Sequence, residues 1–293
     1  MSLRGKSINL FLMDGEPGGR IKCTLANWTG IAYKIPRTEL DKCKNRDDLK
    51  QSGVYFLFGT SDQTGDTVVY IGQAGIRKNG EGILSRLQEH KRNPDKDYWT
   101  EAVVFTTINN SFGPTEISYL ENRFCKIAIE ANRYTVKNGN DPSPGNITEE
   151  KESELEEYID YAKIIMGTLG HKIFVPVNAV LSELPGENSC EEETRLYLKT
   201  TKANALGIRT NEGFVVLKGS EVASNPTRSC PDIVLNLRTR YADRIDSEHI
   251  VTEDILFSSP SAAAGFVTYA SANGLIMWHT EDGRTLKELE NEN

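Results

Sequence analysis

Short apolar runs separated by turn-forming residues predict a strand-rich first half of the chain. The clearest signal lies in residues 53–72, where VYFLF and TVVYI are rich in β-branched and aromatic residues and enclose the turn-like GTSDQTGD. Upstream, INLFLMDG reads as a strand that ends in a turn, and RIKCTLANWTGIAYKIPR reads as two strands around NWTG. We therefore expect a β-hairpin over 53–72, preceded by a small β-rich segment over residues 1–50.

Helical spacing of apolar residues predicts the elements that accompany this hairpin. TELDKCKNRDDLKQS reads as a short helix that Thr38 caps. Residues 82–92 place apolar side chains at helical spacing, EAVVFTT reads as a third strand, and residues 113–133 form a long amphipathic pattern with Pro114 in its first turn. The order β-β-α-β-α favours a small α/β unit with an antiparallel hairpin over residues 51–145.

A loop rich in proline, glycine and asparagine, residues 138–146, marks the end of this unit. The acidic run EEKESELEEYID then predicts a helix with Asn146 at its N-cap, HKIFVPV reads as a strand, and LSELPGENSCEEET reads as an acidic connection. We expect residues 146–194 to form a helical and acidic linker. Residues 195–293 predict a separate α+β domain with hairpin strands and a helix that one of the serines of SSPSAAAGFV caps.

Length and composition place the chain among ordinary globular proteins. Its 293 residues are enough for roughly two domains, and 38% of them are hydrophobic. No run approaches the ~20 apolar residues of a membrane span, so we expect no membrane partner. The first apolar run is too short for a secretory signal and breaks at Asp14 and Gly15. We therefore expect a cytoplasmic location.

Cysteine, histidine and net charge narrow the chemistry further. The five cysteines form no CxxC pair and the four histidines form no HxxxH pair, so neither a disulfide framework nor a zinc site is indicated. The formal net charge of −8 is mild evidence against non-specific nucleic-acid binding, which needs a basic face. A local basic groove remains compatible with that charge, because EEKESELEEYID concentrates much of the acid.

Five side chains of the predicted α/β unit suit the hydrolysis of a phosphodiester. Such a reaction needs a group that deprotonates or orients water and cations that neutralise the phosphate. The two predicted strands carry Tyr55 and Tyr70, the first helix carries Arg86 and His90 on one face, and the second helix carries Glu121. A single carboxylate can hold one Mg²⁺ or Mn²⁺ with water and phosphate. Taken singly, each residue also has a structural explanation, as a strand tyrosine or a solvated helix charge.

These motifs, in this order, resemble the GIY-YIG nuclease family. The first motif reads Gly53-Val54-Tyr55, with valine for isoleucine, and the second reads YIG, followed downstream by LSRLQEH and YLENRF. The resemblance covers roughly residues 50–140 and assumes a loop insertion before the first helix. It implies an α/β (α+β) fold with a three-stranded antiparallel sheet flanked by helices, and metal-dependent cleavage of DNA.

The resemblance also implies a role for each of the five side chains. Tyr55 is the general base or the phenol that orients water through a hydrogen-bonded relay, and Tyr70 assists it or contacts phosphate. Arg86 stabilises the pentacovalent transition state. His90 contacts phosphate, although capping of its own helix explains it equally well. Glu121 ligates the single divalent metal ion.

Three further residues are expected to bind DNA. The family often has an asparagine shortly after the second main helix, and Asn132 and Asn138 are both candidates for that position. Lys78, in the loop GIRKNG, is placed to contact the nucleic-acid backbone, although a solvated loop lysine is the alternative. Residues 213–290 resemble an uncharacterised C-terminal domain that is often joined to bacterial GIY-YIG nucleases. That domain is a candidate for recruiting a protein partner.

The sequence therefore leads to a main hypothesis and an alternative. The main hypothesis is a divalent-metal-dependent endonuclease that hydrolyses DNA by direct attack of water on phosphorus. The alternative is a module that binds nucleic acid or protein on a nuclease fold with weak or lost catalysis, which the net charge of −8 favours.

Overall fold

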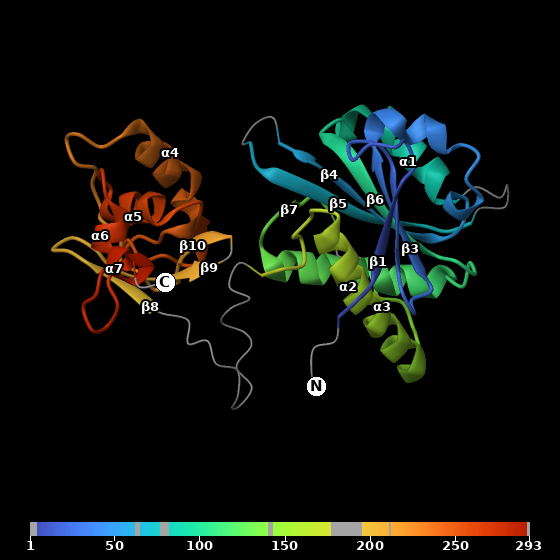
Figure 1. Cartoon of the computed structure of the whole chain (residues 1–293). Helices are drawn as coiled ribbons and strands as arrows, with labels where there is room; N and C mark the ends of the chain where they lie inside the picture. The colour runs from blue at the N-terminus through green and yellow to red at the C-terminus, as the bar shows by residue number, and fades with distance from the viewer. Residues whose placement is uncertain are drawn as a thin grey trace. The chain divides into compact units, whose positions relative to one another are not determined.

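Two mixed α+β units, Met1–Pro176 and Val177–Asn293, make up the chain in the computed structural model (Figure 1). We call them unit 1 and unit 2. The structure describes residues 5–61, 65–76, 82–139, 143–176, 195–210 and 212–291. A seven-stranded sheet organises unit 1 and a four-stranded sheet organises unit 2, which agrees with the α+β class predicted from the sequence. In the described part of the chain, no helix has the length and apolarity needed to cross a membrane.

The sheet of unit 1 has the order β1-β2-β3-β6-β4-β5-β7, antiparallel except where β5 pairs with β7. Its strands are β1 (Ile8–Leu12), β2 (Ile21–Leu25), β3 (Gly30–Pro36), β4 (Gly53–Thr60), β5 (Thr67–Ala74), β6 (Trp99–Thr107) and β7 (Thr135–Val136). The β4–β5 hairpin is the one that the sequence predicts. The pairing of β3 with β6 differs from the predicted division at residue 50, because it makes residues 1–50 part of the same sheet.

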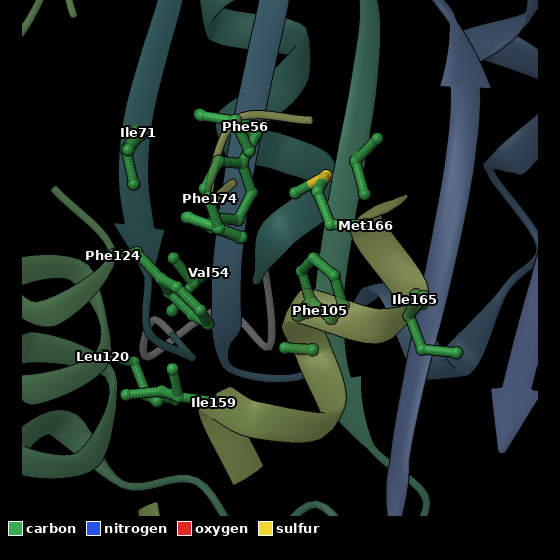
Figure 2. Close-up of a cluster of buried hydrophobic side chains, with 14 of the residues drawn as sticks. Val54, Phe56, Ile71, Phe105, Leu120, Phe124, Ile159, Ile165, Met166 and Phe174 are labelled. Carbon is green, nitrogen blue, oxygen red and sulfur yellow. The ribbon is translucent and has the colours of Figure 1, made fainter. Parts of the chain in front are cut away.

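One face of this sheet is covered by α2 (Pro114–Ala131) and α3 (Glu149–Thr168). Figure 2 shows the side chains buried between the sheet and these two helices. Among them, Val54 and Phe56 of β4 face Phe124 of α2 and Ile159 of α3. Alternation along β4 sends these side chains to this face and the intervening ones to the other. Because α3 packs into this core, it belongs to unit 1 and is not part of a linker.

The opposite face is covered by α1 (Ile83–Arg92) and by two short 3₁₀ helices, η1 (Arg37–Cys43) and η2 (Asp47–Leu49). The sequence predicts one short helix over residues 38–52 with Thr38 as its cap; the structure has these two 3₁₀ helices instead, and Thr38 lies inside η1. Its apolar residues Leu40 and Cys43 are three positions apart, a spacing that one face of a 3₁₀ helix accommodates, and both are buried against the sheet.

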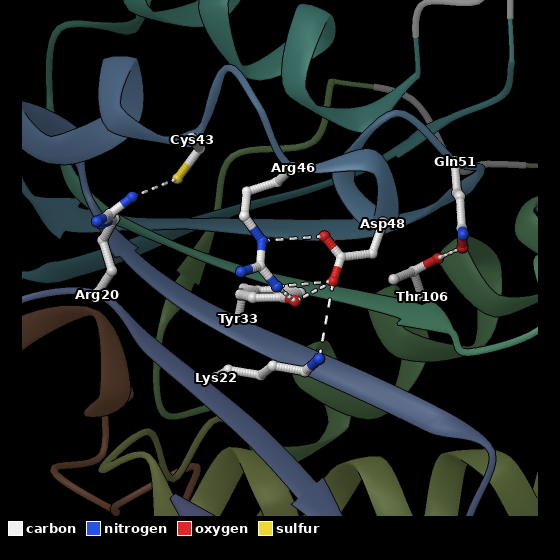
Figure 3. Close-up of polar contacts among 8 residues, drawn as sticks. All are labelled: Arg20, Lys22, Tyr33, Cys43, Arg46, Asp48, Gln51 and Thr106. Atoms are coloured by element: carbon white, nitrogen blue, oxygen red, sulfur yellow. Dashed lines mark hydrogen bonds and ion pairs between the residues drawn. The ribbon is translucent and has the colours of Figure 1, made fainter. Parts of the chain in front are cut away.

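A polar network holds the η1–η2 segment on the sheet (Figure 3). The carboxylate of Asp48 accepts hydrogen bonds from the guanidinium of Arg46, at 2.9 and 3.2 Å, and from the hydroxyl of the fully buried Tyr33. The ammonium of Lys22 lies 3.8 Å from the same carboxylate. Next to this network, the hydroxyl of Thr106 donates to the carbonyl of Ser52 at 2.8 Å. These bonds account for every carboxylate oxygen of Asp48, so the network is structural.

Two local predictions around α3 are also corrected. The N-cap is Thr148, whose hydroxyl accepts from the backbone N–H of Lys151, and not Asn146. Residues 171–176 form turns where the sequence predicts a strand. The reason is packing: the ring of Phe174 lies 5.2 Å from that of Phe124, centroid to centroid, and so enters the core without a strand. The acidic connection predicted over residues 181–194 lies outside the described residues.

Unit 2 forms a small separate α+β unit, as the sequence predicts. Its sheet has the order β11-β10-β9-β8, with antiparallel pairs. Its elements are β8 (Arg195–Lys199), β9 (Asn204–Thr210), β10 (Gly213–Val216), α4 (Asp232–Arg240), η4 (Ala242–Arg244), β11 (Ile255–Phe257), α5 (Pro260–Thr268), α6 (Gly274–Met277) and α7 (Leu286–Asn291). Ser259 caps α5 by accepting from Ala262 N–H. Phe266 of α5 and Trp278 are central to its core, and the indole N–H of Trp278 donates to Pro260.

Candidate active site

Tyr55 of β4 and His90 of α1 form a buried hydrogen-bonded pair. The phenol oxygen lies 2.7 Å from Nε2 of the imidazole, and the two side chains belong to residues that are only 1% and 4% exposed. Alternation along β4 directs Tyr55 toward α1, and His90 lies in the last turn of that helix with its side chain against the sheet. Two residues that the sequence places on different elements are thus in direct contact.

The charge state of this pair follows from its burial. Burial, together with the nearby cations Lys96 and Arg86, lowers the pKa of His90 to about 4. Burial also raises the pKa of Tyr55 well above its ordinary value. Near neutral pH both groups are therefore uncharged. In the tautomer with its proton on Nδ1, Nε2 of His90 accepts a hydrogen bond from the hydroxyl of Tyr55.

Close packing explains why the two tyrosine motifs contain glycine. Gly72 of β5 is paired with Tyr55, and a Cβ at this position would lie 2.4 Å from the phenol oxygen. A Cβ on Gly53 would lie 2.3 Å from the carbonyl oxygen of Phe105 on β6. The tyrosine ring therefore occupies the space that a side chain on the neighbouring strand would need, which explains why the second tyrosine motif ends in glycine.

Tyr70 of β5 lies beside this pair and carries a lysine on its ring. Its ring centroid is 6.3 Å from that of Tyr55 and 5.4 Å from that of His90. The ammonium of Lys96, in η3 (Pro94–Lys96), lies 3.1 Å from the centroid of the Tyr70 ring. Such a contact is a cation–π interaction. The sequence did not point to Lys96, because it lies beyond α1, where helical periodicity no longer places side chains.

Arg86 extends from the middle of α1 toward the same tyrosines. Its guanidinium lies close enough to the two phenols that its charge lowers the pKa of Tyr55 and of Tyr70, against the larger effect of burial. The same guanidinium pairs with Glu89 at 2.7 Å, in a half-exposed ion pair on the helix surface. Arg86 is therefore a cation within reach of both phenols.

Glu121 approaches from α2. Its half-buried carboxylate lies near Gln73, whose side-chain amide donates to the hydroxyl of Ser118 at 3.1 Å. Burial raises the pKa of Glu121, and hydrogen bonding to Gln73 and the charge of Arg86 partly offset this. In turn the negative charge of Glu121 raises the pKa of Tyr70, so the two groups lie within electrostatic range. The alternation of side chains along β5 could have indicated from the sequence that Gln73 lies on the face that α2 covers.

The carboxylate of Glu121 is compatible with a single hard cation. Among the described residues, no group of three or more His, Cys, Asp or Glu side chains could enclose a metal ion. Mg²⁺ keeps several water ligands and is commonly bound through one or two carboxylates together with substrate phosphates. One half-buried carboxylate fits that type of site, and it does not fit a metal centre built from protein ligands alone.

The remaining predicted residues have different positions. Asn138 follows β7, and its side-chain amide donates to the carbonyl of Ile71 at 2.7 Å and accepts from the N–H of the same residue at 3.1 Å. It therefore continues the pairing along β5 and has a structural role. Asn132 is the left-handed C-cap of α2, with φ of 50°. Lys78 lies outside the described residues.

Comparison with known proteins bears on unit 2. Residues 196–290 match a family described as a domain of unknown function (DUF4357). Searches of curated proteins and of solved structures found no match. The matched segment contains the region that the sequence likened to an uncharacterised C-terminal domain, and it lies wholly outside the site built by β4, β5, α1 and α2.

Proposed function

We propose that unit 1 is a divalent-metal-dependent endonuclease of the GIY-YIG type, which hydrolyses DNA phosphodiester bonds. The observation that carries this proposal is the 2.7 Å contact between Tyr55 and His90, with Tyr70 and Arg86 beside it and Glu121 in electrostatic range. The three adjacent antiparallel strands β5, β4 and β6 support it, since they correspond to the sheet that the family resemblance implies.

The neutral pair supplies a route for a proton. A water molecule that attacks phosphorus must lose a proton, and the phenol oxygen of Tyr55 accepts it as its own hydroxyl proton passes to Nε2 of His90. The imidazolium formed is unfavourable in the free protein, because the pKa of His90 is about 4. A phosphate beside the pair stabilises that cation, so the transfer becomes easier when substrate is bound.

The other side chains act on charge. Arg86 faces the place where negative charge accumulates on the phosphate, and its guanidinium is suited to bind two oxygens of one phosphate. Glu121 would hold the Mg²⁺ or Mn²⁺ ion. When bound, that ion polarises the phosphate and stabilises the departing oxygen. The ring of Tyr70 lies between Tyr55 and Lys96 and forms one wall of the proposed site.

Asn138 is the better candidate for the family's asparagine. Its two hydrogen bonds to Ile71 hold the segment after α2 against β5, immediately before Gly72. This role is positional: it orders the strand that carries Tyr70. We therefore assign Asn138 to support of the site and not to contact with DNA.

Relaxation of supercoiled plasmid tests the proposal. With Mg²⁺ or Mn²⁺ we expect nicking by the wild type, and a loss of about 10²-fold or more in Tyr55→Phe and in Glu121→Gln. Matched controls are Tyr161→Phe, whose hydroxyl donates to the surface residue Glu157, and Glu130→Gln, an exposed position on the same helix as Glu121. Tight DNA binding without nicking would favour the alternative, a binding module on a nuclease fold.

A further inference from the structure

Lys96 is a half-buried cation next to the site. Its ammonium lies 3.1 Å from the ring centroid of Tyr70, and within the described ranges no carboxylate pairs with it. Two nearby cations differ in this respect. Lys91 pairs with Asp41 at 2.8 Å, and Arg86 pairs with Glu89 at 2.7 Å. In the part of the chain that the structure describes, Lys96 therefore carries a positive charge without an ion-pair partner beside the two tyrosines.

The segment that carries Lys96 is held in place by a residue of the N-terminal segment. The guanidinium of Arg37 donates to the carbonyls of Lys91 at 3.1 Å, Asp97 at 2.8 Å and Trp99 at 3.1 Å. It also pairs with the carboxylate of Asp97 at 2.7 Å. These contacts close the turn between α1 and β6 on both sides of Lys96, so its position over the ring is part of the fold.

Three groups face Lys96, and the guanidinium among them makes its positive charge less favourable in the free protein. They are Tyr70 from β5, and Arg86 and His90 from α1. Burial and repulsion from Arg86 lower the pKa of Lys96 to about 8, and Lys96 in turn lowers that of His90. An anion bound between the ammonium and the guanidinium would relieve this repulsion.

We propose that Lys96 contacts the phosphate backbone of the bound DNA, and that it shares one phosphate with Arg86 on the open side of the Tyr70 ring. The proposal rests on the proposed function, and it adds to it a residue that no motif supplies. It also gives the N-terminal segment a part in the site, because Arg37 positions the turn that carries Lys96.

The salt dependence of DNA binding tests this contact without any cleavage. A short fluorescent duplex is titrated in EDTA with the wild type, Lys96→Met, Lys96→Arg and the matched control Lys91→Met. One lost phosphate contact lowers the slope of log K against log salt by about 0.9. We expect that change in Lys96→Met, with a several-fold loss of affinity, and wild-type behaviour in Lys91→Met and Lys96→Arg. Equal slopes and affinities in Lys96→Met and Lys91→Met would overturn the proposal.

The pH dependence provides a second readout, and Lys96→Arg serves if Lys96→Met folds poorly. Because the pKa of Lys96 is about 8, the wild type loses this positive charge between pH 7 and pH 9, and its DNA affinity falls. Arginine stays charged, so Lys96→Arg should not show that fall; an equal fall in both proteins would count against the contact.

Cleavage separates the two claims. Normal plasmid nicking by Lys96→Met, with an unchanged salt slope, would refute the role of Lys96 and leave the nuclease intact. Absence of nicking by the wild type would refute the nuclease, while the changed slope of Lys96→Met would still support the phosphate contact.

Discussion

Acidification should destabilise unit 1 through His90, and the effect can be worked out from its surroundings. In the unfolded chain the pKa of a histidine is 6.5, and in the folded protein burial and two neighbouring cations lower that of His90 to about 4. The unfolded state therefore binds a proton more readily than the folded state. Stability is complete above the unfolded value and is lost as the pH falls from 6.5 toward 4.

The magnitude follows from the two values. Each pKa unit corresponds to 1.36 kcal/mol, so the difference between the unfolded and folded pKa of His90 lowers the free energy of unfolding by about 3 kcal/mol once the pH is below both values. Over the experimentally convenient interval from pH 7 to pH 5, the loss is about 2 kcal/mol. His90 is only 4% exposed, so solvent screening reduces this little.

Urea unfolding of the wild type and of His90→Gln at both pH values isolates the contribution. Fluorescence of Trp28 and Trp99 reports unit 1 if both proteins carry Trp278→Phe, because Trp278 belongs to the core of unit 2. We expect the wild type to lose about 2 kcal/mol more than His90→Gln between pH 7 and pH 5. An equal loss in both would show that His90 is not held neutral, and the proton route through Tyr55 would lose its acceptor.

Two further substitutions test how the site is built. Gly72→Ala should lower the free energy of unfolding by about 1–3 kcal/mol and abolish nicking, because the new Cβ would lie 2.4 Å from the phenol oxygen of Tyr55. Thermal unfolding and the plasmid assay measure the two effects. Gly139→Ala is the control, since a Cβ at that position would have no neighbour within 4 Å. Asn138→Ala should cost about 2 kcal/mol in urea unfolding, since it removes two hydrogen bonds to Ile71. Wild-type stability in either variant would contradict the packing and hydrogen bonding described.

The parts of the site that follow a local pattern could be predicted from the sequence. Alternation within β4 and β5 places Tyr55 and Tyr70 on one face of a hairpin, and helical spacing places Arg86 and His90 on one face of α1. The structure brings these four side chains together. The role of Gly72 was hidden, because a close approach between strands is a property of register and not of composition.

What the sequence could not supply depends on long-range pairing or on irregular backbone. The pairing of β3 with β6 joins residues that are some seventy positions apart, so no local pattern encodes it. Lys96 lies in a single turn of 3₁₀ helix, and its place over Tyr70 depends on the bonds of Arg37 to three carbonyls. The sequence predicts one short helix for the η1–η2 segment, and its many polar residues give no sign that it divides into two 3₁₀ helices.

The most direct measurement of the central claim is a double-variant cycle on the rate of metal-dependent plasmid nicking, with Tyr55→Phe, Glu121→Gln and the combined variant. Side chains that act on one transition state give strongly non-additive losses. If β4 and α2 bring these two groups to the same phosphate, the combined variant should be little slower than the slower single variant. Additive losses, in which the combined variant is slowed by the product of the two single factors, would contradict a shared site.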